Sequence, residues 1–254
     1  MSDEVLTERD GAVLVITMNR PQARNAVNGA LAHAVAAALD ELDEDPTLAV
    51  GVLTGAGGSF CSGMDLKAFL TGDIPSVEGR GLAGITLTPP AKPMIAAVEG
   101  YALAGGCEIA LACDLIVASR EAKFGLPETK RSLVAGAGGL FRLPQRIPRA
   151  IAMEYALTGD FFGAEDAHTW GLVNHLTDPG EALVGALELA RKITANGPLA
   201  IRATKQIVAE GADWPADERW QRQEAIMRPV MTSKDAREGA TAFAEKRAPV
   251  WTGE

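Results

Sequence analysis

Apolar positions in the first half of the chain form short runs, each followed by a turn or by a helical stretch. Short apolar runs between turn residues are typical of buried strands. Asn28 precedes a stretch with leucine, valine and alanine at helical spacing, and it can cap a helix that extends to about Asp43. A second, almost wholly apolar helix is expected at Cys107–Cys113. Strands are predicted at Val13–Met18, Val50–Thr54, Met94–Val98, Leu115–Ala118 and Lys123–Phe124.

Two later parts of the chain follow other patterns. Residues 68 to about 90 show little periodicity and are interrupted by prolines, which predicts a mobile loop that could cover a site. From Arg149 onward the spacing is mostly helical. Helices are predicted at Arg149–Leu157, Ala164–Trp170, Glu181–Ala195, Pro198–Glu210, Asp217–Met231 and Lys234–Glu245, with one more strand at Val173–Leu176.

The order of these elements predicts an α/β fold with repeated strand–strand–helix units in the first two-thirds and a helical last quarter. A chain of 254 residues can form one large domain, or one domain with an appendage. Apolar stretches on the helices from about residue 198 fit either contact with a neighbouring subunit or a self-contained helical cap.

Composition and charge narrow the classes of function. The formal net charge of −9 argues against a nucleic-acid partner, because neutralising phosphates needs a basic face. No apolar run reaches the roughly 20 residues that a membrane span needs. The acidic N-terminal segment MSDEVLTERDG resembles neither a signal nor a transit peptide. The three cysteines lack metal-ligand spacing and suit reduced thiols in a cytoplasm, and the three histidines form no metal pattern, so no metal is expected.

Two glycine-bearing loops carry the candidate chemistry. The first, GAGGSFCSGMDLK, runs from Gly55 to Lys67, and the second, EGYALAGGCEIALACD, runs from Glu99 to Asp114. Each follows a predicted strand and ends where a helix is expected, so each offers unpaired N–H groups at the positive end of a helix. Two such turns side by side would aim two donors at one oxygen, which is the geometry of an oxyanion hole. The GAGG sequences that begin at Gly55 and Gly136 do not complete a dinucleotide-binding GxGxxG motif, because Phe60 and Phe141 stand at its last glycine position.

Two glutamates accompany these loops. Glu108 lies three residues after Gly105, in the apolar helix that the second loop opens, and Glu128 lies in FGLPETKR. A carboxylate in a buried helix costs several kcal/mol unless something requires it. An oxyanion hole with two carboxylates suits chemistry at the carbon next to a thioester carbonyl.

From about Val13 to Pro249, the chain resembles the crotonase, or enoyl-CoA hydratase/isomerase, superfamily. The resemblance rests on several motifs in one register: NRPQARNAV, FCSGMDLK, GYALAGGCEIALACD, AKFGLPE, GAGG, LTGDFFGAEDAHTWGLVNHL and FAEKRAP. It implies a spiral of ββα units at residues 1–195 and a helical trimerisation region at residues 196–254. In the family, two such trimers often stack into a hexamer.

The resemblance also implies roles for individual residues. The N–H groups of Met64 and Gly105 would bind the thioester oxygen, and Glu108 and Glu128 would be catalytic. The coenzyme A thioester is the substrate, with no permanently bound cofactor. Residues implied to line the coenzyme A channel are Ala23, Arg24, Ala26, Cys61, Ser62, Asp65, Leu66 and Lys67, with Phe243 and Lys246 reaching the coenzyme of an adjacent subunit.

Three departures from the family pattern bear on the reaction. Ala104 replaces the first of three glycines, Ala135 replaces a proline before GAGG, and Lys130 and Arg131 stand soon after Glu128 where many hydratases have apolar residues. Cations within reach would favour the charged form of Glu128 and weaken it as a proton donor; pointing into solvent, they would matter little.

The retained pair of glutamates favours hydration of a 2-enoyl-CoA, or the reverse dehydration of a 3-hydroxyacyl-CoA. A carnitinyl-CoA dehydratase-like enzyme, an enoyl-CoA isomerase and a non-catalytic acyl-CoA-binding protein are the alternatives. An isomerase needs only one carboxylate, so the retention of both glutamates argues against an isomerase. The acyl group itself is not readable from these motifs.

Overall fold

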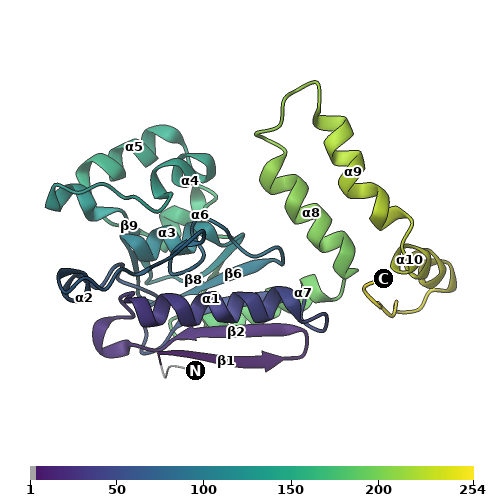
Figure 1. Cartoon of the computed structure of the whole chain (residues 1–254), viewed down its shortest axis with the longest axis horizontal. Coiled ribbons are helices and arrows are strands. Elements are labelled where there is room, and N and C mark those ends of the chain that lie inside the picture. The colour runs from purple at the N-terminus through teal and green to yellow at the C-terminus, as the bar shows by residue number, and fades with distance from the viewer. Residues whose placement is uncertain (1–3) are drawn as a thin grey trace.

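A six-stranded sheet forms the centre of the computed structural model, which describes residues 4–254 (Figure 1). Its order is β1-β2-β3-β6-β8-β11; the β1–β2 pair is antiparallel and every later pair is parallel. The strands are β1 (Val5–Asp10), β2 (Val13–Met18), β3 (Val50–Gly55), β6 (Met94–Val98), β8 (Leu115–Ser119) and β11 (His175–Thr177).

The strands in the middle of this sheet are buried on both faces, because their alternate side chains meet different helices. In β6, Ile95 and Ala97 pack with the alanines of α7 (Ala182–Thr194), while Ala96 and Val98 face the larger core. That larger core includes α1 (Gly29–Glu44) and α3 (Gly105–Ala112). A sheet covered on both faces explains why its strands read as continuous apolar runs.

Smaller elements join the central sheet to the loops of the site. A three-stranded sheet has the order β10-β9-β7, and β4 and β5 form a hairpin. These elements are β4 (Ser76–Val77), β5 (Gly81–Leu82), β7 (Tyr101–Leu103), β9 (Lys123–Gly125), β10 (Phe162–Gly163), α2 (Leu66–Leu70), α4 (Gly139–Arg146), α5 (Arg149–Thr158), α6 (Ala164–Thr169) and the 3-10 helices Pro21–Ala23 and Pro127–Arg131.

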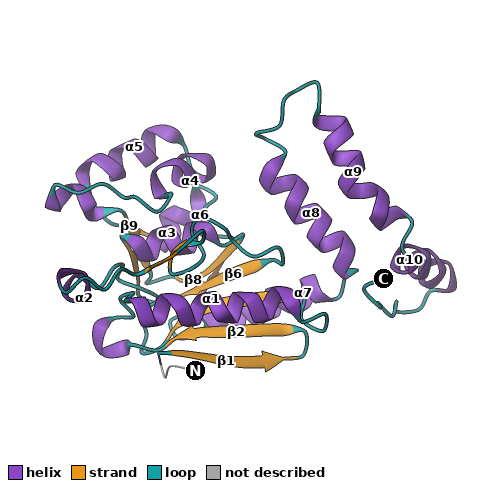
Figure 2. Ribbon diagram, in the orientation of Figure 1, coloured by secondary structure: helices purple, strands orange, loops and turns teal. Residues whose placement is uncertain are grey.

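The last three helices project from the body of the molecule. They are α8 (Pro198–Glu210), α9 (Arg219–Met231) and α10 (Lys234–Glu245). Helices α8 and α9 pack against each other, and α10 lies beyond them at the far end of the projection (Figures 1 and 2). Across residues 4–254, no helix combines the length and apolar character that crossing a membrane requires.

The structure corrects several sequence-based expectations. Residues 68–90 were expected to be one loop, but they contain the end of α2 and the β4–β5 hairpin. The last strand, predicted at Val173–Leu176, is His175–Thr177. Strands β1 and β7 and helix α4 were not predicted. The first three residues of the acidic N-terminal segment lie outside the described residues.

Candidate active site

The two glycine loops meet at Gly63 and Gly105. A Cβ added to Gly105 would lie 3.7 Å from the backbone nitrogen of Met64, and one added to Gly63 would lie 3.2 Å from the backbone nitrogen of Gly105. The two N–H groups expected to form an oxyanion hole therefore belong to adjoining backbones. The loops are joined by an isolated bridge between Cys61 and Ala102.

Neither N–H group is used by the secondary structure around it. Val27 donates to the carbonyl of Gly63 and accepts from Asp65, so the bridge between Val27 and Met64 leaves the Met64 N–H out. Gly105 is the first residue of α3, where an N–H has no partner within the helix. Both donors are thus available to an oxygen placed between the loops.

Close packing of the loops requires glycine at two positions. Gly63 has a φ of +100°, and a Cβ there would lie 2.9 Å from the Cβ of Ala104. A Cβ on Gly106 would stand 2.1 Å from the carbonyl oxygen of Cys61, a distance that no side chain tolerates. The shape of the site therefore depends on the absence of two methyl groups.

Ala104 shows the cost of the missing first glycine. It is the N-cap of α3, with φ +52° and ψ −127°, a conformation that glycine adopts far more readily. Its N–H donates to the carbonyl of Gly125 at 2.9 Å, and that hydrogen bond holds the strained turn in place. The replacement leaves the start of α3 intact and places the strain next to Gly105.

Glu108 is the buried carboxylate of the site, with 3% of its surface exposed. Its Oε1 accepts hydrogen bonds from the backbone N–H groups of Ala137 at 2.7 Å and Gly139 at 2.9 Å. Burial raises the pKa of Glu108, while these two donors and the charge of Arg142 oppose the rise. The carboxylate is therefore held in one orientation.

Glu128 lies near enough to Glu108 for the two charges to interact, and its side chain is less buried than that of Glu108. Burial and the charge of Glu108 raise the pKa of Glu128, while a hydrogen bond from its own backbone N–H and the charge of Arg131 oppose the rise. Its Oε2 is buried and lacks a hydrogen-bond partner among the described residues. A buried, unpartnered carboxyl oxygen with a raised pKa suits a group that holds a proton.

An apolar cavity of about 540 Å³ adjoins Glu128. Its walls come from the segment around Glu128, from α4 and from α5. The residues that line it are Leu126, Glu128, Thr129, Val134, Ala135, Leu140, Phe141, Leu143, Pro144, Arg149, Ala152, Met153, Ala156 and Leu157. Cavities of this size accept small-molecule ligands or their apolar parts.

Several of the residues expected to line a coenzyme channel gather beside the first loop. Ser62 donates its N–H to the carbonyl of Arg24 at 3.0 Å and its hydroxyl to the carbonyl of Ala23 at 3.3 Å. The Arg24 guanidinium lies 5.5 Å from the centre of the Tyr101 ring. These contacts bring the 23–26 turn against residues 61–64.

The other residues that are expected to line the coenzyme channel differ in their exposure to solvent. Asp65 caps α2 and pairs with Arg20 at 3.0 Å, whereas Leu66 and Lys67 are exposed on α2. Ala26 and Cys61 are buried. Burial raises the pKa of the Cys61 thiol to about 12, so it is not a nucleophile at neutral pH.

Phe243 and Lys246 are not brought to this site within one chain. Phe243 is exposed near the end of α10, and Lys246 caps that helix with a φ of +56°. Helices α2 and α10 lie at opposite ends of the molecule (Figure 1).

Three groups of the site were not predicted from the sequence. They are the N–H groups of Ala137 and Gly139, which hold Glu108, and the side chain of Arg142. The GAGG motif gave the only clue to this loop, because glycines permit close backbone approach. Its role as a carboxylate cradle depends on tertiary contacts.

Comparison with known proteins shows the family to which the chain belongs. Residues 8–254 match the family described as "Enoyl-CoA hydratase/isomerase". The chain belongs to that family. It is 44% identical to the enoyl-CoA hydratase EchA19 of Mycobacterium tuberculosis, over 97% of this chain and 95% of that protein. It is 42% identical to the carnitinyl-CoA dehydratase of Salmonella typhi, over the full length of both.

A solved structure extends the family match to three dimensions. The enoyl-CoA hydratase EchA1 of Mycobacterium marinum is 62% identical, with a TM-score of 0.98 and full coverage of both chains. The chain therefore has the α/β crotonase fold with C-terminal helices, and the resemblance found in its motifs is confirmed.

Proposed function

We propose that this protein is a hydro-lyase that adds water across the double bond of a 2-enoyl-CoA, or removes it from a 3-hydroxyacyl-CoA. The observation that carries the proposal is the adjoining of two unengaged N–H groups, of Met64 and Gly105, in a site that also holds two carboxylates with raised pKa values. The family match and the hydratase relatives support it.

The chemistry assigns each group one task. Water attacks the third carbon, and the electron pair of the double bond moves toward the thioester oxygen, which the N–H groups of Met64 and Gly105 stabilise. Each such donor is worth on the order of 10²–10³ in rate. Glu108 takes a proton from the attacking water, and Glu128 delivers a proton to the second carbon. The sum is the addition of one water molecule.

The cavity beside Glu128 favours a neutral, apolar acyl group. Besides Glu128, its only charged lining side chain among the described residues is that of Arg149. A cationic acyl group such as a carnitinyl moiety would meet that arginine. The carnitinyl-CoA dehydratase relatives make this dehydratase the second candidate, and the cavity argues for an apolar substrate.

We further propose that residues 196–254 form a homotrimerisation region, with trimers that can stack in pairs. Trp220, Met231 and Phe243 expose much of their apolar surface on α9 and α10, and such patches mark contact sites. Phe243 and Lys246 would then reach the coenzyme A of a neighbouring subunit. The cysteines at 61, 107 and 113 are free, which supports a reducing, cytoplasmic compartment.

The deciding experiment follows loss of the conjugated enoyl-thioester absorbance with 2-enoyl-CoAs from short to bulky. Glu108→Gln and Glu128→Gln should each lower the rate by about 10²–10⁴. Near wild-type turnover by Glu128→Gln would refute its assignment as the acid. Binding of acyl-CoA without turnover would indicate a non-catalytic binder, and a shifted double bond without water uptake would indicate an isomerase.

A further inference from the structure

Arg142, on α4, joins two loops that meet at the site. One end of its guanidinium, Nη1, donates to the carbonyl of Ala137 at 3.2 Å, and the other, Nη2, donates to the carbonyl of Thr86 at 2.6 Å. The N–H of Ala137 donates in turn to Oε1 of Glu108. The same peptide segment is therefore tied to Arg142 on one side and to the carboxylate on the other.

The second loop held by Arg142 covers the oxyanion hole. Thr86 is buried, and Leu82, the last residue of β5, lies four residues before it. A Cβ added to Gly105 would stand 2.6 Å from Cδ2 of Leu82, so that side chain lies directly over Gly105. The Arg142 guanidinium thus connects the segment of Leu82 and Thr86, which lies over the oxyanion hole, with the loop whose N–H groups hold Glu108.

The charge of Arg142 acts on the same carboxylate. Burial lowers the pKa of Arg142, Arg146 lowers it further, and Glu108 raises it. The charged groups around this pair are Glu128, from the 3-10 helix Pro127–Arg131, and Arg146, one turn along α4.

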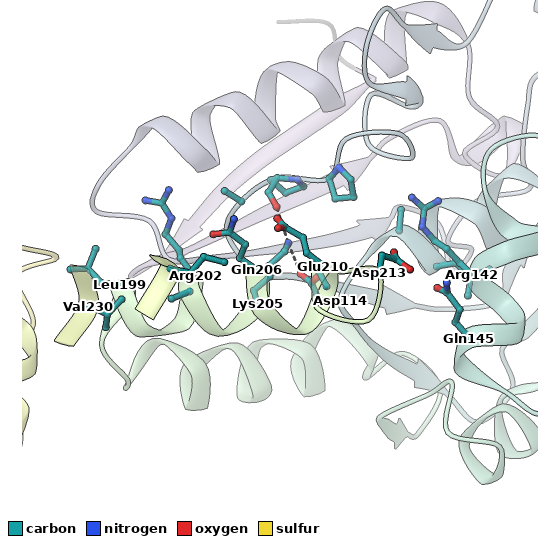
Figure 3. Close-up of a pocket in the computed structure, with 18 of the residues that line it drawn as sticks. Asp114, Arg142, Gln145, Leu199, Arg202, Lys205, Gln206, Glu210, Asp213 and Val230 are labelled. Atoms are coloured by element: carbon teal, nitrogen blue, oxygen red, sulfur yellow. Dashed lines mark hydrogen bonds and ion pairs between the residues drawn. The ribbon is translucent and has the colours of Figure 1, made fainter. Parts of the chain in front are cut away.

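Arg142 also lies at one end of a cavity of about 1020 Å³. The charged side chains of Arg202, Lys205 and Glu210 on α8, and of Asp213, line the same cavity (Figure 3).

We propose that Arg142 is a positioning residue for the hydration step: it fixes the loop that holds Glu108 and sets a positive charge near that carboxylate, which acts as the base. This inference rests on the proposed function. Arg142 touches no reacting atom; it acts through the Ala137 peptide and through its charge. A planar guanidinium suits the task because its N–H donors diverge toward two carbonyls at once.

The test compares Arg142→Gln and Arg142→Lys with the wild type over a range of pH. Arg142→Gln removes the charge that opposes the rise in the Glu108 pKa, so the acid limb of the kcat/KM profile should move to higher pH. Its kcat should fall by about 10–100-fold, with a smaller change in KM, because misplacement of the base by a fraction of an ångström slows the step. Arg142→Lys should leave the acid limb in place but retain the loss in kcat.

Arg146→Gln is the matched control. Its guanidinium donates to the carbonyl of Cys113, and among residues 4–254 it makes no hydrogen bond or ion pair with the loop that holds Glu108. It should lower thermal stability without moving the acid limb. An unmoved acid limb in Arg142→Gln, with the wild type active, would overturn the proposal even if kcat fell.

A second measurement separates this inference from the proposed function. The titration of Glu108 can be followed by the ¹³C signal of its carboxyl group, assigned with Glu108→Gln. Arg142→Gln, or Arg142→Met if the glutamine variant does not fold, should titrate at higher pH than the wild type. If the wild type hydrates no 2-enoyl-CoA, the proposed function fails, and this titration still decides whether the charge of Arg142 favours the ionised form of Glu108.

Discussion

The backbone of Gly106 presses against Cys61 so closely that a Cβ on Gly106 would stand 2.1 Å from the Cys61 carbonyl oxygen. Because Cys61 and Gly106 lie on the two loops that carry the proposed N–H donors, this contact sets the spacing of the proposed oxyanion hole. Any side chain at position 106 must push the loops apart.

Gly106→Ala should therefore lose about 10²–10³ in kcat, the value of one oxyanion donor. Gly197→Ala is the control, because a Cβ there makes only ordinary contacts with the Trp251 ring, 3.7 Å away. Steady-state rates and circular dichroism distinguish a widened site from an unfolded chain. A folded Gly106→Ala variant with wild-type turnover would contradict the role of this contact.

The cation near Glu128 should govern the basic limb of the pH profile. Arg131 lowers the pKa of Glu128, so its removal should raise that pKa and leave the proton in place to higher pH. Arg131→Gln is expected to move the descending limb of kcat/KM toward higher pH.

Lys130→Gln offers the comparison within the same turn. Lys130 pairs with Asp160 on the exposed side and is not among the groups that shift the pKa of Glu128. Its substitution should leave the limb unmoved. A shift of equal size in both variants would show that Glu128 senses net charge alone.

Glu108 should cost stability at neutral pH. Its folded-state pKa lies above the ordinary value of 4.5, so the stability it contributes is full below that value and is lost as pH rises through the folded pKa. Glu108→Gln should therefore melt at a higher temperature than the wild type at pH 7 and lose this advantage near pH 4. Thermal unfolding at the two pH values measures the difference; equal melting temperatures at pH 7 would refute it.

Ala104→Gly should relieve the strained turn before Gly105. A non-glycine residue in a disfavoured positive-φ conformation costs about 1–3 kcal/mol, part of which is offset by the greater freedom of glycine in the unfolded chain. A net gain of about 1 kcal/mol corresponds to a rise of about 2–4 °C in Tm for a chain of this size. A lower Tm in scanning calorimetry would show that the packing of the Ala104 methyl group outweighs the strain.

The cavity beside Glu128 should determine which acyl groups are accepted. Ala156, half-buried on α5, lines it. Ala156→Phe fills part of its volume and should lower kcat/KM for long or bulky 2-enoyl-CoAs far more than for the four-carbon substrate. A uniform loss across chain lengths would place the acyl group elsewhere.

Elements with strong local patterns were predictable from the sequence. The N-cap Asn28, which accepts a hydrogen bond from the N–H of Leu31, and the strand Met94–Val98 agree with the structure. Strand β1 was missed because only Val5 is buried in it, and α4 was missed because Pro144 lies inside it. Weak burial and a helix-breaking residue remove the signals that periodicity provides.

The candidate site was predictable only where its residues lie within one motif. Glu108 and Gly105 share a helix, so their proximity follows from sequence spacing. The partners of Glu108 lie 29 and 31 residues away, and Arg142 reaches Thr86 across 56 residues. Such contacts depend on how α3 and α4 pack, which local patterns do not encode.

Both hydrogen bonds that hold Glu108 end on the same oxygen, Oε1. The carboxylate is thus asymmetric: one oxygen serves as an anchor, and in the proposed reaction the other is the atom that would meet water. A glutamine at this position would keep the anchor with its carbonyl oxygen and turn its NH₂ toward the substrate side. It would present a donor where the reaction needs an acceptor, so a single-atom exchange can preserve the architecture of the site while reversing its polarity.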